Sequence, residues 1–313
     1  MERQQIPGRL NVFLVLLTTG MQLALLVLAS QCVARFGDPG WWWVLVISVP
    51  FSCLFLTVYA LMHEASHGSL YPNPHLNRWL GACCGIFFPT SATMMRITHA
   101  VHHRCNRTDH EMFDCYYAGD RRWLKRAQWY AILLGGFYLI IPLGALIIAW
   151  GRPLLLTRPF KGSRSASVLY DDFTPAALWI VRLESSLCLA FYGMLFASGM
   201  LLPWPTALLF LVGGLNWSTR QYVTHAWSPR EVIDGAHDLQ VNPLMRCVLL
   251  NGHLDLVHHR HPTASWHELP TLVRGDRPAI RFWQQYLSLW AGPRPTAEPG
   301  PSPLPDLVAE RAA

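Results

Sequence analysis

The chain has 313 residues, of which 52% are hydrophobic and only 14% are charged. Average soluble domains carry roughly a quarter charged residues, so this composition argues against a wholly water-exposed protein. A net charge of +6 would suit nucleic-acid binding, but the basic residues lie beside long apolar runs, where the positive-inside rule explains them. We therefore expect an integral membrane protein without a nucleic-acid partner. The eight scattered cysteines are interpreted as small apolar residues.

Two apolar runs near the N-terminus are predicted to span the membrane. The first, 10–33, follows the basic residues Arg3 and Arg9 and is long enough to cross a bilayer core of about 30 Å. A secretory signal peptide, the alternative for this run, would have a shorter apolar core and a cleavage site. The second run, 41–61, begins with three tryptophans, which favour the membrane interface. With the N-terminal arginines inside, the second span ends at the cytoplasmic face.

Two further segments are expected to dip into the membrane without crossing it. Residues 77–95 are moderately apolar but are interrupted by glycines and a proline. Residues 127–150 are strongly apolar, yet basic clusters lie on both flanks, at 121–126 and 152–164. Basic residues on both sides favour a re-entrant hairpin over a full crossing.

Two later runs, 176–200 and 206–224, complete the predicted membrane domain. The sequence thus predicts an all-α, polytopic membrane protein with about four transmembrane helices and one re-entrant hairpin at 127–150. Residues 1–290 are expected to form this domain, including a cytoplasmic helical cap, and residues 291–313 a disordered Pro-rich tail.

Nine of the 14 histidines form four groups at or beyond the cytoplasmic ends of the predicted spans. If 99–103 is helical, its three histidines fall at i, i+3 and i+4 and share one face. Neutral imidazoles are good ligands for transition metals, and so many of them suit two metals better than one. We interpret the isolated His75, His237 and His267 as capping or core residues. The four groups are His63 and His67; His99, His102 and His103; His225, one turn after Gln221; and His253, His258 and His259.

Three of these groups resemble the histidine boxes of the membrane fatty acid desaturase family, which also includes hydroxylases and carotenoid ketolases. The boxes read HEASH at 63–67, HAVHH at 99–103 and HLDLVHH at 253–259. Arg96, three residues before the second box, and the sequence HHRHPTASWHELP at 258–270 also fit the family pattern. The resemblance covers roughly residues 40 to 270 and implies a cytoplasmic metal site.

The resemblance implies two iron ions at this site and O2 as co-substrate, with no catalytic side chain beyond the metal ligands. Gln221 and His225 resemble a pair that helps to complete the site in some members, with Gln221 as a water-mediated ligand. The expected ligands are His63, His67, His99, His102, His103, His225, His258 and His259.

The third box departs from the family pattern H-x-x-H-H, because His253 lies five residues before His258 and Asp255 occupies the usual position. Either the chain bulges so that His253 binds a metal, which we favour, or Asp255 supplies an oxygen ligand. His261 is a further local alternative. Carboxylates near the boxes are interpreted as partners that orient imidazoles, or else as solvated charges: Glu64, Asp109, Glu111, Asp114 and Asp238.

The family resemblance implies oxidation of an acyl chain carried by a lipid, acyl-CoA or acyl carrier protein. Desaturation is the expected outcome, with hydroxylation or ketone formation as alternatives. No Cys-x-x-Cys, Rossmann or haem pattern is visible, so electrons are expected from a separate donor: ferredoxin, rubredoxin or a cytochrome with its reductase. The spans and the compact length suggest a bacterial inner membrane, with the active site facing the cytoplasm.

Two other classes of protein compete with this interpretation. HEASH also matches H-E-x-x-H, in which two histidines bind zinc and Glu64 would be the base of an intramembrane metalloprotease. That class leaves the second and third boxes unexplained. A metal transporter would need ionisable residues along a path near mid-membrane, whereas these histidines lie at span ends. We therefore favour the di-iron oxidoreductase.

Overall fold

The structure is a computed structural model that describes residues 5–151, 154 and 172–305. Within these residues the chain is mostly helical, and the strands are two-residue pieces that pair in parallel. The predicted all-α class is confirmed. The basic residues Arg3, Arg152, Arg158, Lys161 and Arg164, on which part of the topology prediction rests, lie outside the described residues.

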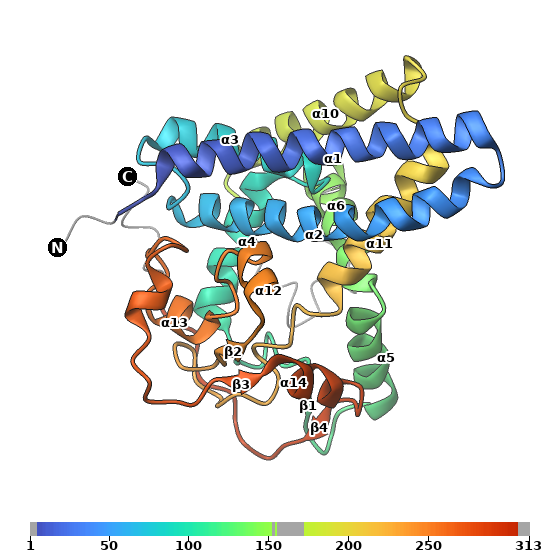
Figure 1. Cartoon of the computed structure of the whole chain (residues 1–313). Coiled ribbons are helices and arrows are strands. Elements are labelled where there is room, and N and C mark those ends of the chain that lie inside the picture. Colours follow the sequence, from blue (N-terminus) through green and yellow to red (C-terminus); the bar gives the residue numbers. More distant parts are fainter. Residues whose placement is uncertain (1–4, 152–153, 155–171, 306–313) are drawn as a thin grey trace.

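Three helices are long and apolar enough to cross a membrane: α1 (Gly8–Phe36), α2 (Gly40–His67) and α10 (Pro175–Ala197). Figure 1 shows α1 and α2 running side by side along one side of the molecule. Their outward side chains are apolar and exposed, as for Leu16 (63%) and Val46 (62%). Such a surface suits lipid and not water, which confirms the prediction of a polytopic membrane protein.

Two further helix pairs are apolar enough to cross but are sharply bent. Helices α3 (Pro74–Phe87) and α4 (Ala92–Cys105) meet at 99°, and α5 (Arg122–Leu133) and α6 (Gly136–Trp150) meet at 86°. The second break lies at Gly135, whose φ of 93° is accessible mainly to glycine. Up to five spans result if each bent pair forms one span.

The prediction of a span over 206–224 is wrong in its last part, 219–224. Helix α11 (Pro203–Ser218) has 16 residues and gives way to turns after Ser218, so it is shorter than the roughly 20 residues that a perpendicular crossing needs. The polar residues Thr219, Arg220 and Gln221 follow directly. These turns redirect the chain and bring His225 into the molecule's interior.

The membrane part packs around α2, which contacts α1, α3, α4 and α11. The ring of Phe55 on α2 stacks on Phe88, with centroids 4.5 Å apart. A Cβ atom on Gly214 of α11 would lie 1.9 Å from Cδ1 of Tyr138 on α6, so glycine is required for this close approach of the two helices. The packing holds the histidine-bearing ends of α2 and α4 beside each other.

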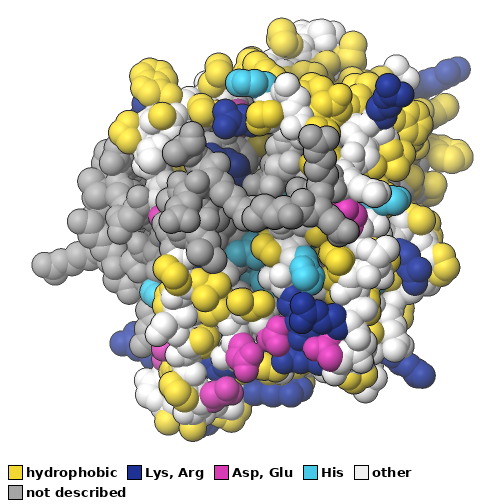
Figure 2. Space-filling model, turned by 90° about the vertical axis from the view of Figure 1, so that its left-hand side faces the viewer, with side chains coloured by type: hydrophobic (Ala, Val, Ile, Leu, Met, Phe, Trp, Pro, Cys, Tyr) yellow, Lys and Arg dark blue, Asp and Glu magenta, His cyan; other side chains and the backbone are white. Residues whose placement is uncertain are grey.

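The remaining elements form a cap against these helix ends (Figure 1). Its helices are α12 (Pro243–Val248), α13 (Asp255–Arg260), the 3-10 helix η1 (Leu269–Leu272) and α14 (Phe282–Leu289). Strand β2 (Leu239–Gln240) pairs with β3 (Ile280–Arg281). On the face drawn in Figure 2, Asp and Glu side chains gather in the lower part beside Lys and Arg, while hydrophobic side chains dominate the top.

The Pro-rich tail, predicted to be disordered, makes specific contacts in its described part, 291–305. Strand β4 (Arg294–Pro295) pairs with β1 (Cys115–Tyr116). Further along, the amide of Leu304 donates to the carbonyl of Arg104 (3.0 Å). The described residues of this segment therefore belong to the cap.

Candidate metal centre

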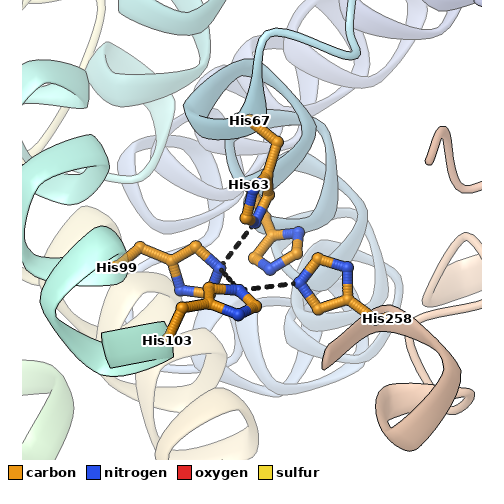
Figure 3. A group of neighbouring side chains, drawn as sticks. All are labelled: His63, His67, His99, His103 and His258. Atoms are coloured by element: carbon orange, nitrogen blue, oxygen red, sulfur yellow. Dashed lines mark hydrogen bonds between the residues drawn. The ribbon is translucent and has the colours of Figure 1, made fainter. Parts of the chain in front are cut away.

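Five histidines from three helices form the first of two groups. His63 and His67 lie one turn apart at the end of α2, His99 and His103 one turn apart on α4, and His258 lies on α13. Each offers a ring nitrogen, and the five nitrogens lie within 4.8 Å of one another. Figure 3 shows the five rings converging on one point from three sides.

Three further histidines form the second group. His102 of α4, His225 from the turns after α11 and His259 of α13 offer nitrogens that also lie within 4.8 Å of one another. The groups adjoin, because the ring centroids of His103 and His259 are 4.5 Å apart. Together the two groups contain the eight histidines that the family resemblance predicts as ligands.

The adjacent pairs His102–His103 and His258–His259 each contribute one ring to each group. Successive residues on an α-helix point about 100° apart, since a turn takes 3.6 residues. Each helix can therefore serve two neighbouring ions. His99, His102 and His103 do share one side of α4, since the ring centroids of His99 and His102 are 5.6 Å apart, but His102 belongs to the second group.

Local capping holds two of the three histidine-bearing helices, α4 and α13, in place. The N-cap of helix α4 is Ser91, whose Oγ accepts from the amide of Met94 (3.0 Å). The six-residue helix α13 is capped by Asp238, whose Oδ1 accepts from the amides of Leu256 (3.0 Å) and Val257 (3.3 Å). Asp238 therefore positions His258 and His259 through the backbone and not through their rings.

The first group contains three short contacts between ring nitrogens, and they cannot all be hydrogen bonds. Nε2 atoms lie 2.8 Å apart in His67 and His99, 3.0 Å in His99 and His103, and 3.0 Å in His103 and His258. One ring nitrogen carries either a proton or a lone pair, so it makes one in-plane hydrogen bond. At most two of the three contacts can therefore be hydrogen bonds. A cation among the four nitrogens would satisfy them all, so the donor set fits a metal ion.

In the second group, oxygen acceptors orient two of the rings in the way that metal-binding histidines need. Nδ1 of His225 lies 3.1 Å from the carbonyl of Gly235, and Nδ1 of His102 lies 2.6 Å from Oε2 of Glu111. An Nδ1–H bond to an oxygen leaves the Nε2 lone pair free for a metal. Nε2 of His259 is buried without a hydrogen-bond partner among the described residues. Burial lowers the pKa of His259 well below its ordinary value, which keeps the ring neutral.

Asp255 lies beside the second group. Its Oδ2 is 3.1 Å from Nε2 of His225, yet this buried oxygen makes no hydrogen bond among the described residues. Burial opposes its ionisation, but His225 outweighs burial and holds the pKa of Asp255 well below its usual range. The carboxylate is therefore ionised and faces a ring nitrogen.

The alternative residue in the third box, His253, belongs to neither group. Its Nδ1 is buried and has no hydrogen-bond partner among the described residues, and burial lowers its pKa to about 4. Asp255 is in neither group either, but it contacts His225 of the second group, and this contact favours Asp255 over His253. Gln221 lies in the turns after α11, where its Nε2 donates to the carbonyl of Trp217 (3.2 Å). His261 is also outside both groups.

Three other carboxylates, expected to orient imidazoles or to be solvated, contact different partners. Glu64 accepts from Ser69 Oγ (2.8 Å) and from the amide of Trp266 (3.0 Å). Asp114 pairs with Arg107 (2.8 Å) in the protein interior, and Asp109 pairs with Arg230 (2.7 Å). Of the five candidate carboxylates, Glu111 is therefore the one that we assign to orienting an imidazole of the two groups.

A cavity of about 430 Å³ adjoins both groups. This volume is typical of a small-molecule site. Its lining includes His63, His99, His102 and His258, and its remaining walls are mainly apolar. The arrangement would place an apolar ligand against a cluster of imidazoles. Apolar wall residues include Leu56, Phe88, Met94, Met95, Phe137, Ile141, Ile148 and Trp217.

Comparison with known proteins adds one match. Residues 40–290 match the family model described as Fatty acid desaturase. No curated protein gives a significant match to the chain. The matched region includes all eight histidines of the two groups, the cavity walls and Asp255.

Proposed function

Since the chain belongs to the fatty acid desaturase family, we propose that it is a di-iron oxidoreductase that uses O2 to desaturate an acyl chain. The observation that carries the proposal is the convergence of five and three imidazoles from separate chain segments on one apolar cavity. Such a donor set fits two transition-metal ions.

The residues that would hold the irons follow from the two groups. His63, His67, His99, His103 and His258 would hold one ion, and His102, His225 and His259 the other. Asp255 would complete the second set, because its unpartnered oxygen faces His225. The chemistry that a bound iron pair supplies is O2-dependent oxidation of an unactivated C–H bond.

The protein's own part is to bind and orient the acyl chain and to exclude water. The apolar walls supplied by Phe88, Met95 and Ile141 suit methylene groups. Glu111 and the Gly235 carbonyl fix the rings of His102 and His225. Electrons would come from a separate donor protein, and the site would face the cytoplasm of a bacterial cell.

The contacts of Glu64 weaken the zinc protease as an alternative. A metalloprotease needs this glutamate free to activate water, but its Oε2 accepts two hydrogen bonds, from Ser69 and Trp266. The second histidine group would also have no role in a protease with one zinc ion.

Lipid profiling by mass spectrometry tests the proposed function. Cells that express the wild-type chain should contain an acyl product with a new double bond. Cells that express His102→Ala should lack it, although the protein inserts in equal amount. A hydroxylated acyl chain or a modified carotenoid would show that the chain catalyses another oxidation and not desaturation. A lipid profile that neither the wild type nor His102→Ala changes would contradict the proposal.

A further inference from the structure

Arg220 is a half-buried cation in the wall of the cavity. It lies in the turns after α11, and its side chain lines the same cavity as His63 and His258. Its Nε donates to the carbonyl of Asn216 (3.0 Å), and its Nη1 lies 3.1 Å from the sulfur of Met245. Its Nη2 is buried and has no hydrogen-bond partner among the described residues.

No described carboxylate neutralises this guanidinium. The described acidic groups that form ion pairs do so with other residues, and the titratable neighbours that act on Arg220 are Cys53 and Tyr286. Both are neutral at pH 7. A buried charge without a partner is costly unless something compensates it. Both the Nη2 donor without a partner and the uncompensated charge of Arg220 would be satisfied by a bound anion.

We propose that Arg220 binds the oxyanion head of an amphipathic acyl substrate, a carboxylate or a phosphate, whose chain occupies the apolar part of the cavity. This inference rests on the proposed function and narrows its substrate. Guanidinium groups bind these oxyanions through short, charge-assisted hydrogen bonds. A carotenoid or a plain hydrocarbon has no such head and would leave Arg220 uncompensated.

A head fixed at Arg220 would also set which carbon of the chain lies at the histidines. Trp217, Gln221 and Leu250 line the cavity together with Arg220, and members of both histidine groups line it as well. The distance along the chain from head to oxidised carbon would then be constant. Chains of different length would be oxidised at the same position counted from the head.

Equilibrium binding to the anaerobic, detergent-solubilised full-length protein tests the inference without turnover. The probes are palmitate, 1-hexadecanol, which has the same chain and a neutral head, and 1-palmitoyl lysophosphatidate. The wild-type protein should bind the better of the two anions ~10–100-fold more tightly than the alcohol, as expected for charge-assisted hydrogen bonds. Tighter binding of palmitate or of lysophosphatidate identifies the head as carboxylate or phosphate.

The variant Arg220→Gln should bind these anions no better than the alcohol, with affinity for the alcohol unchanged. Arg220→Lys should keep part of the preference. The matched control is Arg246→Gln, since Arg246 is exposed near Met245 and does not line the cavity. Equal wild-type affinity for anions and alcohol would overturn the inference, and so would an Arg220→Gln variant that keeps the preference or loses all three ligands together.

Iron content, measured on the same samples, separates the two proposals. Iron-loaded protein without an anion preference would refute the role of Arg220 and leave the oxidoreductase standing. An anion preference in protein that takes up no iron would support Arg220 and refute the di-iron function.

Discussion

Nε2 of His225 and Oδ2 of Asp255 lie 3.1 Å apart in the protein interior, and the oxygen makes no hydrogen bond among the described residues. The other ring nitrogen of His225 faces the carbonyl of Gly235, so a neutral ring has its lone pair on Nε2. A lone pair and a carboxylate oxygen repel at this distance unless a proton or a metal ion lies between them. This pair therefore marks a position beside the second histidine group at which a cation can bind.

Two alanine substitutions test which residue of the third histidine box, Asp255 or His253, is a metal ligand. Asp255→Ala should lower the iron content by about one ion per chain, because it removes an oxygen that faces the second group. His253→Ala should retain both ions, because His253 lies outside both groups. Elemental analysis of the purified variants measures this. The opposite pattern, with iron lost only in His253→Ala, would restore His253 as the ligand.

Glu111 should control the second ion through His102. Glu111→Ala removes the acceptor that lies 2.6 Å from Nδ1 of His102. Loss of such an orienting partner typically costs ~10–100-fold in metal affinity or activity. Iron titration of the metal-free protein measures the affinity, and the exposed Glu231 supplies a matched control, Glu231→Ala. Equal iron affinity in both variants would show that Glu111 has no orienting role.

The stability of the cap should depend on pH through Asp234. Hydrogen bonds from Arg260 lower the pKa of Asp234, with help from Arg277 and against the repulsion of Asp276. A lowered folded-state pKa contributes stability above the unfolded value of about 3.9 that is lost as pH falls through the folded value.

Asp234→Asn should therefore destabilise the protein at pH 7 and pH 5 by at most about 1 kcal/mol, because the pair is partly exposed. The difference from wild type should shrink below about pH 4. Unfolding midpoints in detergent at several pH values measure it. A difference that grows as the pH falls would have the wrong sign.

Gly214 should be intolerant of a larger side chain. Gly214→Ala places a Cβ 1.9 Å from Cδ1 of Tyr138 and should destabilise the protein by ~1–3 kcal/mol through overpacking. A Cβ added to Gly193 on α10 would meet nothing within 4 Å, so Gly193→Ala should be neutral or slightly stabilising. Thermal unfolding of both variants in detergent compares them, and equal midpoints would contradict the close contact of α11 and α6.

The eight histidines could be predicted from the sequence because spacing within a helix is a local property. Residues four apart, such as His99 and His103, must share a face, and span ends place separate boxes at one membrane surface. Their division into five and three could not be predicted, because it depends on how α2, α4 and α13 are oriented about the cavity. The number of imidazoles already suggested two metal ions, and the family resemblance implied that both are iron.

Other features of the site depend on tertiary contacts that leave no sequence signal. Arg220 looks like an ordinary basic residue after a helix, and its importance lies in the absence of a described carboxylate beside it. Glu111 cannot be distinguished from four other carboxylates until its contact with His102 is known. The early end of α11 at Ser218 is hard to predict because the following residues, including Tyr222 and Val223, are still partly apolar.

The metal content of the purified full-length protein tests the central claim most directly. We predict about two iron ions per chain and little zinc, with a di-iron absorption spectrum that changes when the reduced protein meets O2. One zinc ion per chain without iron would contradict the di-iron function, because the second of the two adjoining histidine groups would then have no use.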